Sequence, residues 1–236
     1  RTPHGRMTCL TCRNVKTSTT VLTTHSLKKA GLQVGLAGNV GKSLALQVAT
    51  ENFDYYVIEL SSFQLDNMCR FKADIAVLLN ITPDHLDRYG HNMQNYVDAK
   101  FRITQNQPED DAFIFWNDDP ILTCELSKYP LKASLYPFAA PHEEVAKAYV
   151  EDEQLCIETP GDLFVMLEEE LSLPGRHNLY NSLAAGISAR ILELKKETVR
   201  EALPVFTGVD HPLETAPAVR RVSFSNDSTP TNVTQC

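Results

Sequence analysis

Two apolar segments constrain the fold of this chain more than any other feature of its sequence. Tyr55–Leu60 (YYVIEL) and Asp74–Ile81 (DIAVLLNI) are nearly continuous apolar runs. Strands with this pattern are buried on both faces, as they are in a parallel sheet that is covered by helices on both sides. The two segments therefore indicate an α/β protein with a parallel sheet.

Strand and helix patterns alternate along the rest of the chain. Further strands are expected at Met7–Thr11, Ala112–Trp116 and Val222–Ser225. Helices are expected where apolar residues recur at helical spacing, at Ser18–Ala30, Asn95–Asn106, Asn178–Leu194 and Glu197–Leu203. The remaining expectations are a turn at Asn117–Pro120, a small antiparallel section within residues 131–173 and a linker at Phe206–Glu214. This alternation predicts a doubly wound α/β domain whose mainly parallel sheet is flanked by helices.

Composition narrows the class of protein and of partner. The 236 residues are 43% hydrophobic, which is an ordinary globular balance in a chain long enough to bury a full core. The net charge of −8 argues against a general binder of nucleic acids or of anionic membranes. No apolar run approaches the ~20 residues of a membrane span. Nucleotides stay compatible with this charge, because helix ends bind small anions locally.

Cysteine usage indicates a reducing compartment. The six cysteines have irregular spacings in a long chain, so we expect free thiols in the cytoplasm. Cys9-x-x-Cys12 has the spacing of zinc ligands, and His4 and His25 could complete a site, although no second Cys-x-x-Cys pair exists. The simpler interpretation is two small residues in a strand and in the loop that follows it.

The segment from Leu10 to Thr17 (LTCRNVKT) has the layout of a phosphate-binding loop, with a strand, a loop, Lys-Thr and then a helix. Such a loop holds phosphates with backbone N–H groups, while its lysine offsets phosphate charge and its threonine ligates Mg²⁺. However, Cys12 and Val15 occupy positions where glycine normally permits a positive φ and a close approach of phosphate. The start of an ordinary surface helix is therefore the alternative.

Three further polar segments carry candidate residues, and two of them follow predicted strands. Gly38–Ser43 (GNVGKS) also resembles a phosphate loop, but no clear apolar strand precedes it, so a turn before a helix is the alternative. Glu59 ends a buried strand, where parallel sheets place ligand-binding groups, and it would be balanced by a metal ion or by a salt bridge. Asn80–Gly90 (NITPDHLDRYG) follows the other buried strand. Its His85 could ligate metal or meet an anionic substrate, unless the segment is simply a surface loop.

Two predicted helices carry the last candidates. Lys100 is expected to be a solvated lysine on its pattern alone. Asn178 and Asn181 are three residues apart, so both can face one ligand from the first turn of their helix.

Taken in order, these segments resemble the Mur ligase family. The resemblance rests on Lys16-Thr17, GNVGKS, ELSSFQL, NITPDHLDRYG, AKFRI, GRHNLYN and NDS, and it runs from about Met7 to Asn232. It implies that residues 1–206 are the central ATP-binding domain, and that residues 207–236 are a linker and the start of a C-terminal ligase domain. Both ends of the chain look cut, so we expect part of a longer enzyme.

The resemblance also implies roles residue by residue. The catalytic residues would be Lys16, His85 and Lys100, with Lys100 carbamylated so that its amine becomes a metal ligand. The metal ligands would be Thr17, Glu59, His85 and Lys100. The ATP-binding residues would be Asn14, Lys16, Thr17, Ser18, His177, Asn178, Asn181 and Asp227. The substrate-binding residues would be Asn39, Ser61 and His85.

The implied reaction transfers the γ-phosphate of ATP to the carboxylate of UDP-N-acetylmuramoyl-L-alanine. The amine of D-glutamate then attacks the acyl phosphate, which gives an amide, ADP and phosphate. Two Mg²⁺ ions and Lys16 would offset the charge on the transferring phosphoryl group. We expect a cytoplasmic monomer that binds no nucleic acid and no membrane. Another Mur ligase or a folylpolyglutamate-type ligase shares this plan, but ELSSFQL and NITPDHLDRYG favour the D-glutamate-adding enzyme.

The chain departs from the family pattern at several positions. The family loop resembles Gly-(Ser/Thr)-Asn-Gly-Lys-(Ser/Thr), whereas here Cys12 and Val15 replace both glycines and Arg13 adds a bulky cation. Later in the chain, Pro212 replaces an arginine and Thr229 replaces a lysine. We therefore expect a domain that folds, binds ATP weakly and has no ligase turnover alone. A catalytically impaired nucleotide-binding module is the alternative function.

Overall fold

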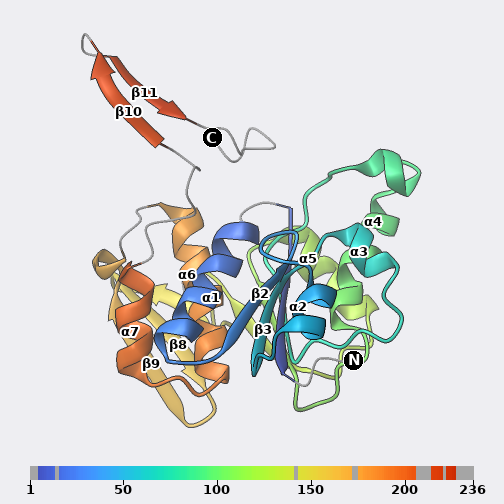
Figure 1. Ribbon diagram of the computed structural model, residues 1–236, viewed down its shortest axis with the longest axis horizontal. Helices are drawn as coiled ribbons and strands as arrows, with labels where there is room; N and C mark the ends of the chain where they lie inside the picture. The colour runs from blue at the N-terminus through green and yellow to red at the C-terminus, as the bar shows by residue number, and fades with distance from the viewer. Residues whose placement is uncertain are drawn as a thin grey trace.

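A computed structural model describes residues 5–13, 16–140, 143–171 and 175–205, and the backbone of two strands at 214–219 and 222–226. Its centre is a nine-stranded sheet in the order β2-β3-β1-β4-β5-β6-β7-β8-β9 (Figure 1). The strands are β1 (Arg6–Thr11), β2 (Val34–Gly38), β3 (Tyr55–Glu59), β4 (Ile75–Leu78), β5 (Ala112–Trp116), β6 (Ser134–Phe138), β7 (Ala148–Glu151), β8 (Gln154–Thr159) and β9 (Asp162–Leu167). All neighbours from β2 to β7 pair parallel, and β7, β8 and β9 pair antiparallel. The predicted α/β class with a mainly parallel sheet is confirmed.

Helices cover both faces of the sheet (Figure 1). One face packs against α1 (Lys16–Lys29), α6 (Arg176–Ile191) and α7 (Lys196–Val205). The other face packs against α2 (Leu44–Thr50), α3 (Ser62–Asp66), α4 (Met93–Phe101) and α5 (Pro120–Glu125). Short 3₁₀ helices lie at η1 (Leu86–Tyr89), η2 (Arg102–Thr104), η3 (Leu126–Lys128) and η4 (Glu168–Glu170).

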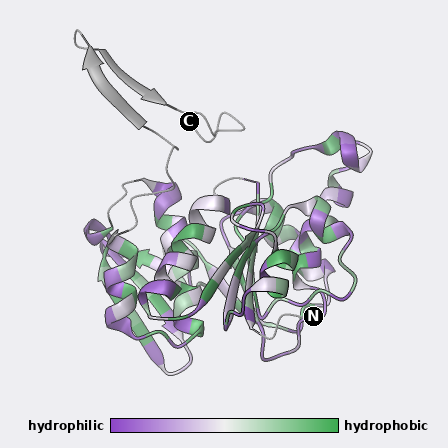
Figure 2. Cartoon of the chain, in the orientation of Figure 1, coloured by the Kyte–Doolittle hydropathy of each residue, from purple (hydrophilic) through white to green (hydrophobic). Residues whose placement is uncertain are grey.

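The core consists mainly of the strands and of the helix sides that face them. Figure 2 shows hydrophobic residues along the central strands and hydrophilic stretches on the outer helices and loops. Val57 of β3, Val77 of β4 and Ile114 of β5 are fully buried on the face that α1 and α6 cover. Burying apolar area at about 25 cal/mol per Å² makes such strands the main favourable term of the fold.

Helix α1 is buried although it is rich in hydroxyl side chains. Thr20, Thr23, Thr24 and Ser26 are at most 4% exposed, and each hydroxyl donates to the backbone carbonyl four residues earlier at 2.7–2.9 Å. Local bonds of this kind satisfy a buried hydroxyl without any partner outside the helix. The polar composition of α1 is therefore compatible with its position against the sheet and beside α6.

Most predicted elements are confirmed, with ends that differ by a few residues. The strands expected at β1, β3, β4 and β5 form, as do the helices at α1, α4, α6 and α7 and the antiparallel section at β7–β9. The strand expected at Val222–Ser225 is β11 (Val222–Asn226), which pairs antiparallel with β10 (Glu214–Val219). Most of the expected linker at Phe206–Glu214 lies outside the described residues, so the boundary between 1–206 and 207–236 stays a prediction.

One expectation needs correction, and the turn expected at Asn117–Pro120 is present. No clear apolar strand was expected before Gly38, but β2 ends there, because its small residues (VGLAG) pair with β3 in spite of a weak strand propensity. The turn expected at Asn117–Pro120 leads directly into α5: the Asp119 side chain accepts from the amides of Ile121 and Leu122, and Pro120 occupies the first helical turn. Helices α2 and α3 were also not predicted.

Candidate active site

Sheet topology brings the candidate residues to one edge. The strands β3, β1 and β4 are adjacent and parallel, so their carboxyl ends meet at the same edge of the sheet. Glu59 ends β3, Lys16 and Thr17 follow the loop after β1, and His85 lies in the loop after β4. The predicted common edge is therefore present, and the roles of these residues stay predictions.

Lys16 is the first residue of α1, and it turns back over the preceding loop. Its ammonium donates to the carbonyl oxygens of Cys12 at 2.8 Å and of Arg13 at 3.0 Å. Asn14 and Val15 lie outside the described residues. Burial raises the pKa of the Cys12 thiol to about 12, although Lys16 and Lys100 lower it, so Cys12 stays protonated at neutral pH.

The zinc interpretation of Cys9 and Cys12 gains no further ligands in the part of the chain that the structure describes, where no three His, Cys, Asp or Glu residues converge. Burial also raises the pKa of the Cys9 thiol, so neither side chain is a ready thiolate. No disulfide joins the cysteines of the described residues.

Thr17 and Glu59 form a pair of oxygen donors behind the loop. The Thr17 hydroxyl donates to Glu59 Oε2 at 2.9 Å, and Glu59 is 4% exposed. Mg²⁺ prefers hard oxygen ligands and is usually held by one or two carboxylates together with substrate phosphates. The pair therefore fits a Mg²⁺ ion that completes its coordination with nucleotide oxygens.

A close backbone approach holds the end of β3 in place. Gly38 has φ +102°, and a Cβ at this position would lie 2.0 Å from the Glu59 carbonyl oxygen. The next residue, Asn39, donates its backbone N–H to the same oxygen at 3.0 Å. Only glycine allows both this φ and this contact, so the end of β2 helps to position Glu59.

The loop after β4 is held from several sides. The Asn80 side-chain oxygen accepts from the Arg13 backbone N–H at 3.0 Å, and Asp119 Oδ2 accepts from the Ile81 N–H at 3.0 Å. His85 has φ +48°, and its imidazole Nε2 lies 3.6 Å from Asp84 Oδ2. With 60% of its side chain exposed, His85 is accessible to a ligand at this edge.

Lys100 is not the solvated lysine that its local pattern indicates. It is 2% exposed on α4, and its ammonium lies 4.9 Å from the ring centroid of Tyr96. Burial, reinforced by Lys16, lowers the pKa of Lys100 to about 7. Desolvation disfavours the charged form, so much of this side chain is a neutral amine at neutral pH.

Two buried hydroxyl groups without hydrogen bonds lie near the candidate site, at the end of β1 and in the loop after β4. Thr11 Oγ1 and Thr82 Oγ1 have no hydrogen-bond partner among the described residues. Buried polar side-chain atoms are normally satisfied, so such a group needs an explanation. A polar ligand with several oxygens at this edge would provide one.

The other predicted binding residues have structural contacts. Ser61 caps α3 by accepting from the Gln64 N–H, and Gln64 reaches back to the Ser61 N–H. Asn39 is exposed at the turn after β2. Lys42 pairs with Glu51 at 2.9 Å, so the structure favours a turn for GNVGKS rather than a second phosphate loop.

Helix α6 begins near the candidate adenine residues. His177 is exposed in its first turn, and Asn178 is partly buried. Asn181 is 2% exposed, and its side-chain oxygen accepts from the Thr19 hydroxyl of α1 at 2.8 Å. Asn181 therefore links α6 to α1, directly behind the phosphate loop. Ser18 is partly buried in the first turn of α1, and Asp227 lies outside the described residues.

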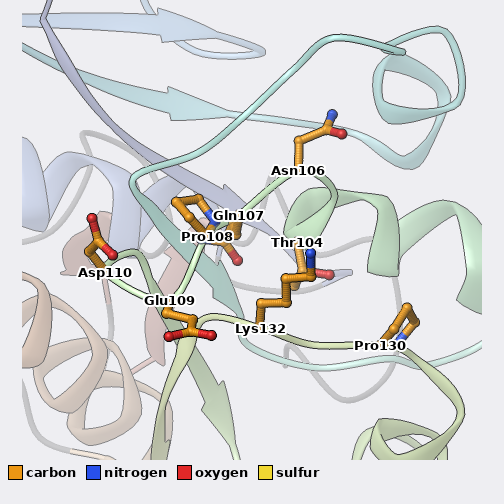
Figure 3. Close-up of a pocket in the computed structure, with 8 residues that line it drawn as sticks. All are labelled: Thr104, Asn106, Gln107, Pro108, Glu109, Asp110, Pro130 and Lys132. Carbon is orange, nitrogen blue, oxygen red and sulfur yellow. The ribbon is translucent and has the colours of Figure 1, made fainter.

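A pocket of about 580 Å³ lies at the opposite edge of the sheet (Figure 3). Its lining includes Asp110, just before β5, and Lys132, just before β6. These are the amino ends of parallel strands, so this pocket is separate from the candidate site.

Sequence reasoning missed some positioning residues of the site. Asp119 fixes the loop after β4 from α5, and the Asp-Pro pair at a helix start was an available signal for its capping role. The contacts of Arg13 with the same loop had no signal in the sequence, because they join residues that are 67 and 70 positions apart.

Comparisons with known proteins agree with the motifs. A model of the Mur ligase middle domain matches residues 14–189. A UDP-N-acetylmuramoylalanine–D-glutamate ligase of Bacteroides thetaiotaomicron is 63% identical over all 236 residues, which are 53% of that relative. The ligase of the same name from Porphyromonas gingivalis is 50% identical over 229 residues, 96% of this chain and 51% of the relative. The chain thus spans about half the length of the curated relatives that it matches.

Solved structures share the fold at low sequence identity. MurF of Acinetobacter baumannii superposes with a TM-score of 0.76 at 19% identity, over 97% of this chain and 52% of that one. MurF ligase of Thermotoga maritima, solved in complex with ADP, gives 0.67 at 20% identity, over 91% of this chain and 51% of that one. No helix among the described residues has the length and apolar character to cross a bilayer. With the middle-domain model matching most of its length, this chain belongs to the Mur ligase family.

Proposed function

We propose that this chain is the ATP-binding part of an enzyme that joins D-glutamate to UDP-N-acetylmuramoyl-L-alanine in peptidoglycan precursor synthesis. The single observation that carries the proposal is the pairing of Thr17 with the buried Glu59 behind Lys16, at the carboxyl ends of adjacent parallel strands. The names of the most similar relatives supply the substrates. Since those relatives are about twice as long, the complete reaction belongs to the longer protein.

The residues of the phosphate site have distinct tasks. Lys16 leaves the carbonyls of its own loop and offsets the negative charge of the β- and γ-phosphates. Thr17 and Glu59 would hold a divalent ion with their side-chain oxygens. Mg²⁺, when bound there, supplies charge neutralisation for phosphoryl transfer to the substrate carboxylate. The amine of D-glutamate then attacks the carbonyl carbon of the acyl phosphate, loses a proton and expels inorganic phosphate, which leaves the amide.

Lys100 is proposed to carry a carbamate. Its neutral amine adds to CO₂, which forms a carbamate and releases one proton, and burial favours the neutral amine that this addition requires. The carbamate oxygens and His85 would then serve a second Mg²⁺. The positive charges of Lys16 and Arg13, which act on Lys100 in the structure, would stabilise the new negative charge.

Recognition of the other ligands is also proposed. Asn178, Asn181 and His177 would meet the adenine at the start of α6, and Asn39 and Ser61 would lie near the muramoyl substrate. We propose that the protein acts as a cytoplasmic monomer. Asn14 and Asp227 complete the proposed ATP contacts.

A catalytically impaired nucleotide-binding module is the second candidate, and the replacement of glycine by the buried Cys12 favours it. Titrating ATP into the chain by calorimetry, with and without Mg²⁺, tests both functions. We expect weak, saturable, Mg²⁺-dependent binding that becomes tighter in the variant with Cys12→Gly and Val15→Gly. Affinity in the low micromolar range for the unaltered chain would contradict the expected weakness. Binding that requires both glycines would favour the impaired module.

A further inference from the structure

Arg13 joins the loop after β1 to the loop after β4. Its backbone N–H donates to Asn80 Oδ1 at 3.0 Å. Its guanidinium donates to the Pro83 carbonyl oxygen at 2.6 Å and lies, through Nε, 3.3 Å from Asp84 Oδ2. One residue of the phosphate loop therefore contacts three residues of the loop that carries His85.

The loop that receives these contacts has little regular structure to hold it. Residues 79–85 form neither helix nor strand between β4 and η1. From α5, Asp119 holds the Ile81 amide. From the phosphate loop, Arg13 holds Pro83 and Asp84, and Asp84 lies 3.6 Å from the imidazole of His85. The position of His85, whose φ is +48°, thus depends on side-chain contacts.

The Arg13–Asp84 pair is shielded from water. The two side chains are 17% and 23% exposed. Both charges act on the buried Lys100, as Lys16 does, so the pair lies close to the candidate site. An ion pair that is shielded from water couples its two loops more strongly than an exposed surface pair does.

We propose that Arg13 is a positioning residue that holds the loop carrying His85 against the phosphate loop. A serine or threonine, the residue type of the family pattern at this position, is too short to reach Pro83 and Asp84 together. In this chain the replaced loop residue therefore adds a link between the two halves of the site. Only the consequence for nucleotide binding depends on the proposed function.

Amide hydrogen exchange of the nucleotide-free chain tests the link directly. In Arg13→Ser, we expect amides of residues 80–89 to exchange about tenfold faster or more, while those of β3 keep their rates. Arg70→Ser is the matched control, because Arg70 is exposed and lies outside both loops. Equal exchange of residues 80–89 in Arg13→Ser and in the unaltered chain would overturn the proposal.

Two further variants separate positioning from a general loss of structure. Arg13→Lys keeps a cation near Asp84 but loses the forked geometry, so its exchange rates should lie between those of the unaltered chain and of Arg13→Ser. In a double-mutant cycle with Asp84→Asn, the combined variant should exchange hardly faster than Arg13→Ser alone. Fully additive effects would show that the two side chains are not coupled, and would overturn the proposal.

An ADP titration with Mg²⁺ gives a readout that a merely structural role would not move. Arg13→Ser should weaken ADP binding about tenfold, and Arg13→Lys should recover part of the loss. Tighter binding by Arg13→Ser would mean that Arg13 obstructs the phosphate loop, which would overturn the proposal. If neither the unaltered chain nor any variant binds ADP, the proposed function fails, and the exchange data still decide the role of Arg13.

Discussion

Because its pKa is lowered in the folded state, the buried Lys100 should make the free energy of unfolding of this domain rise with pH. In the unfolded chain its pKa is near the ordinary value of 10.5, and in the folded chain burial lowers the pKa to about 7. Between these values the unfolded state binds more protons, so the free energy of unfolding must rise with pH. Replacing Lys100 by Met removes the titrating group and keeps a side chain of similar length.

The magnitude follows from the two pKa values. At pH 7 the shift opposes folding by about 4 kcal/mol, and at about pH 9.5 by only ~1.4 kcal/mol, because most of the unfolded-state lysine is still protonated but the folded one is neutral. The unaltered chain should therefore gain about 3 kcal/mol between these conditions relative to Lys100→Met. At pH 7, Lys100→Met should be the more stable protein.

Urea unfolding followed by the fluorescence of Trp116, the single tryptophan, measures this difference. Buffers are kept free of CO₂ so that the amine stays unmodified, and other titrating groups cancel in the comparison of the two proteins. Lys132→Met, at an exposed lysine, is the control and should follow the unaltered chain. If the unaltered chain and Lys100→Met gain equally with pH, the burial argument for Lys100 is refuted. Added bicarbonate should then stabilise the unaltered chain and not Lys100→Met, if the carbamate forms.

Other contacts of the site give further predictions. Thr17→Val should leave Glu59 without its hydroxyl partner and abolish the Mg²⁺-dependent part of ATP binding, whereas Thr17→Ser should retain it; calorimetry with and without Mg²⁺ decides. Asp119→Ala should lower the unfolding free energy by about 2–3 kcal/mol in urea titrations, because it removes a helix cap and leaves a buried amide unsatisfied. Gly38→Ala should lower the unfolding free energy by at least ~2 kcal/mol more than Gly161→Ala does. Both glycines have a positive φ, but only at Gly38 would a Cβ lie against backbone atoms. Equal losses for the two alanine variants would show that the close approach has no effect.

The periodic patterns of the sequence were sufficient to predict the fold class and most of the helices and strands. The apolar runs of β3 and β4 could only be buried on both faces, and such burial requires helices on both sides of a parallel sheet. The segments after these strands already pointed to Glu59 and His85, because the carboxyl ends of parallel strands share one edge. In each case the sequence pattern that allows the prediction lies within one short segment, because buried positions recur regularly along a single strand.

Elements whose stability comes from neighbours could not be predicted in this way. The strand β2 has two glycines in five residues, and it exists because β3 pairs with its backbone. Helix α3 has only five residues, too few to show a helical period, and it is held by the capping box between Ser61 and Gln64.

What the sequence determined by itself is the class of the fold, the order of its main elements and the family motifs at the ends of three strands. Only the tertiary structure decided that Lys100 is buried. It also decided that the Asn181 side chain accepts a hydrogen bond from Thr19, and that Arg13 contacts the loop that carries His85. The physical reason is distance along the chain. Burial patterns repeat within one segment, whereas these environments arise between segments that only the order of strands in the sheet brings together.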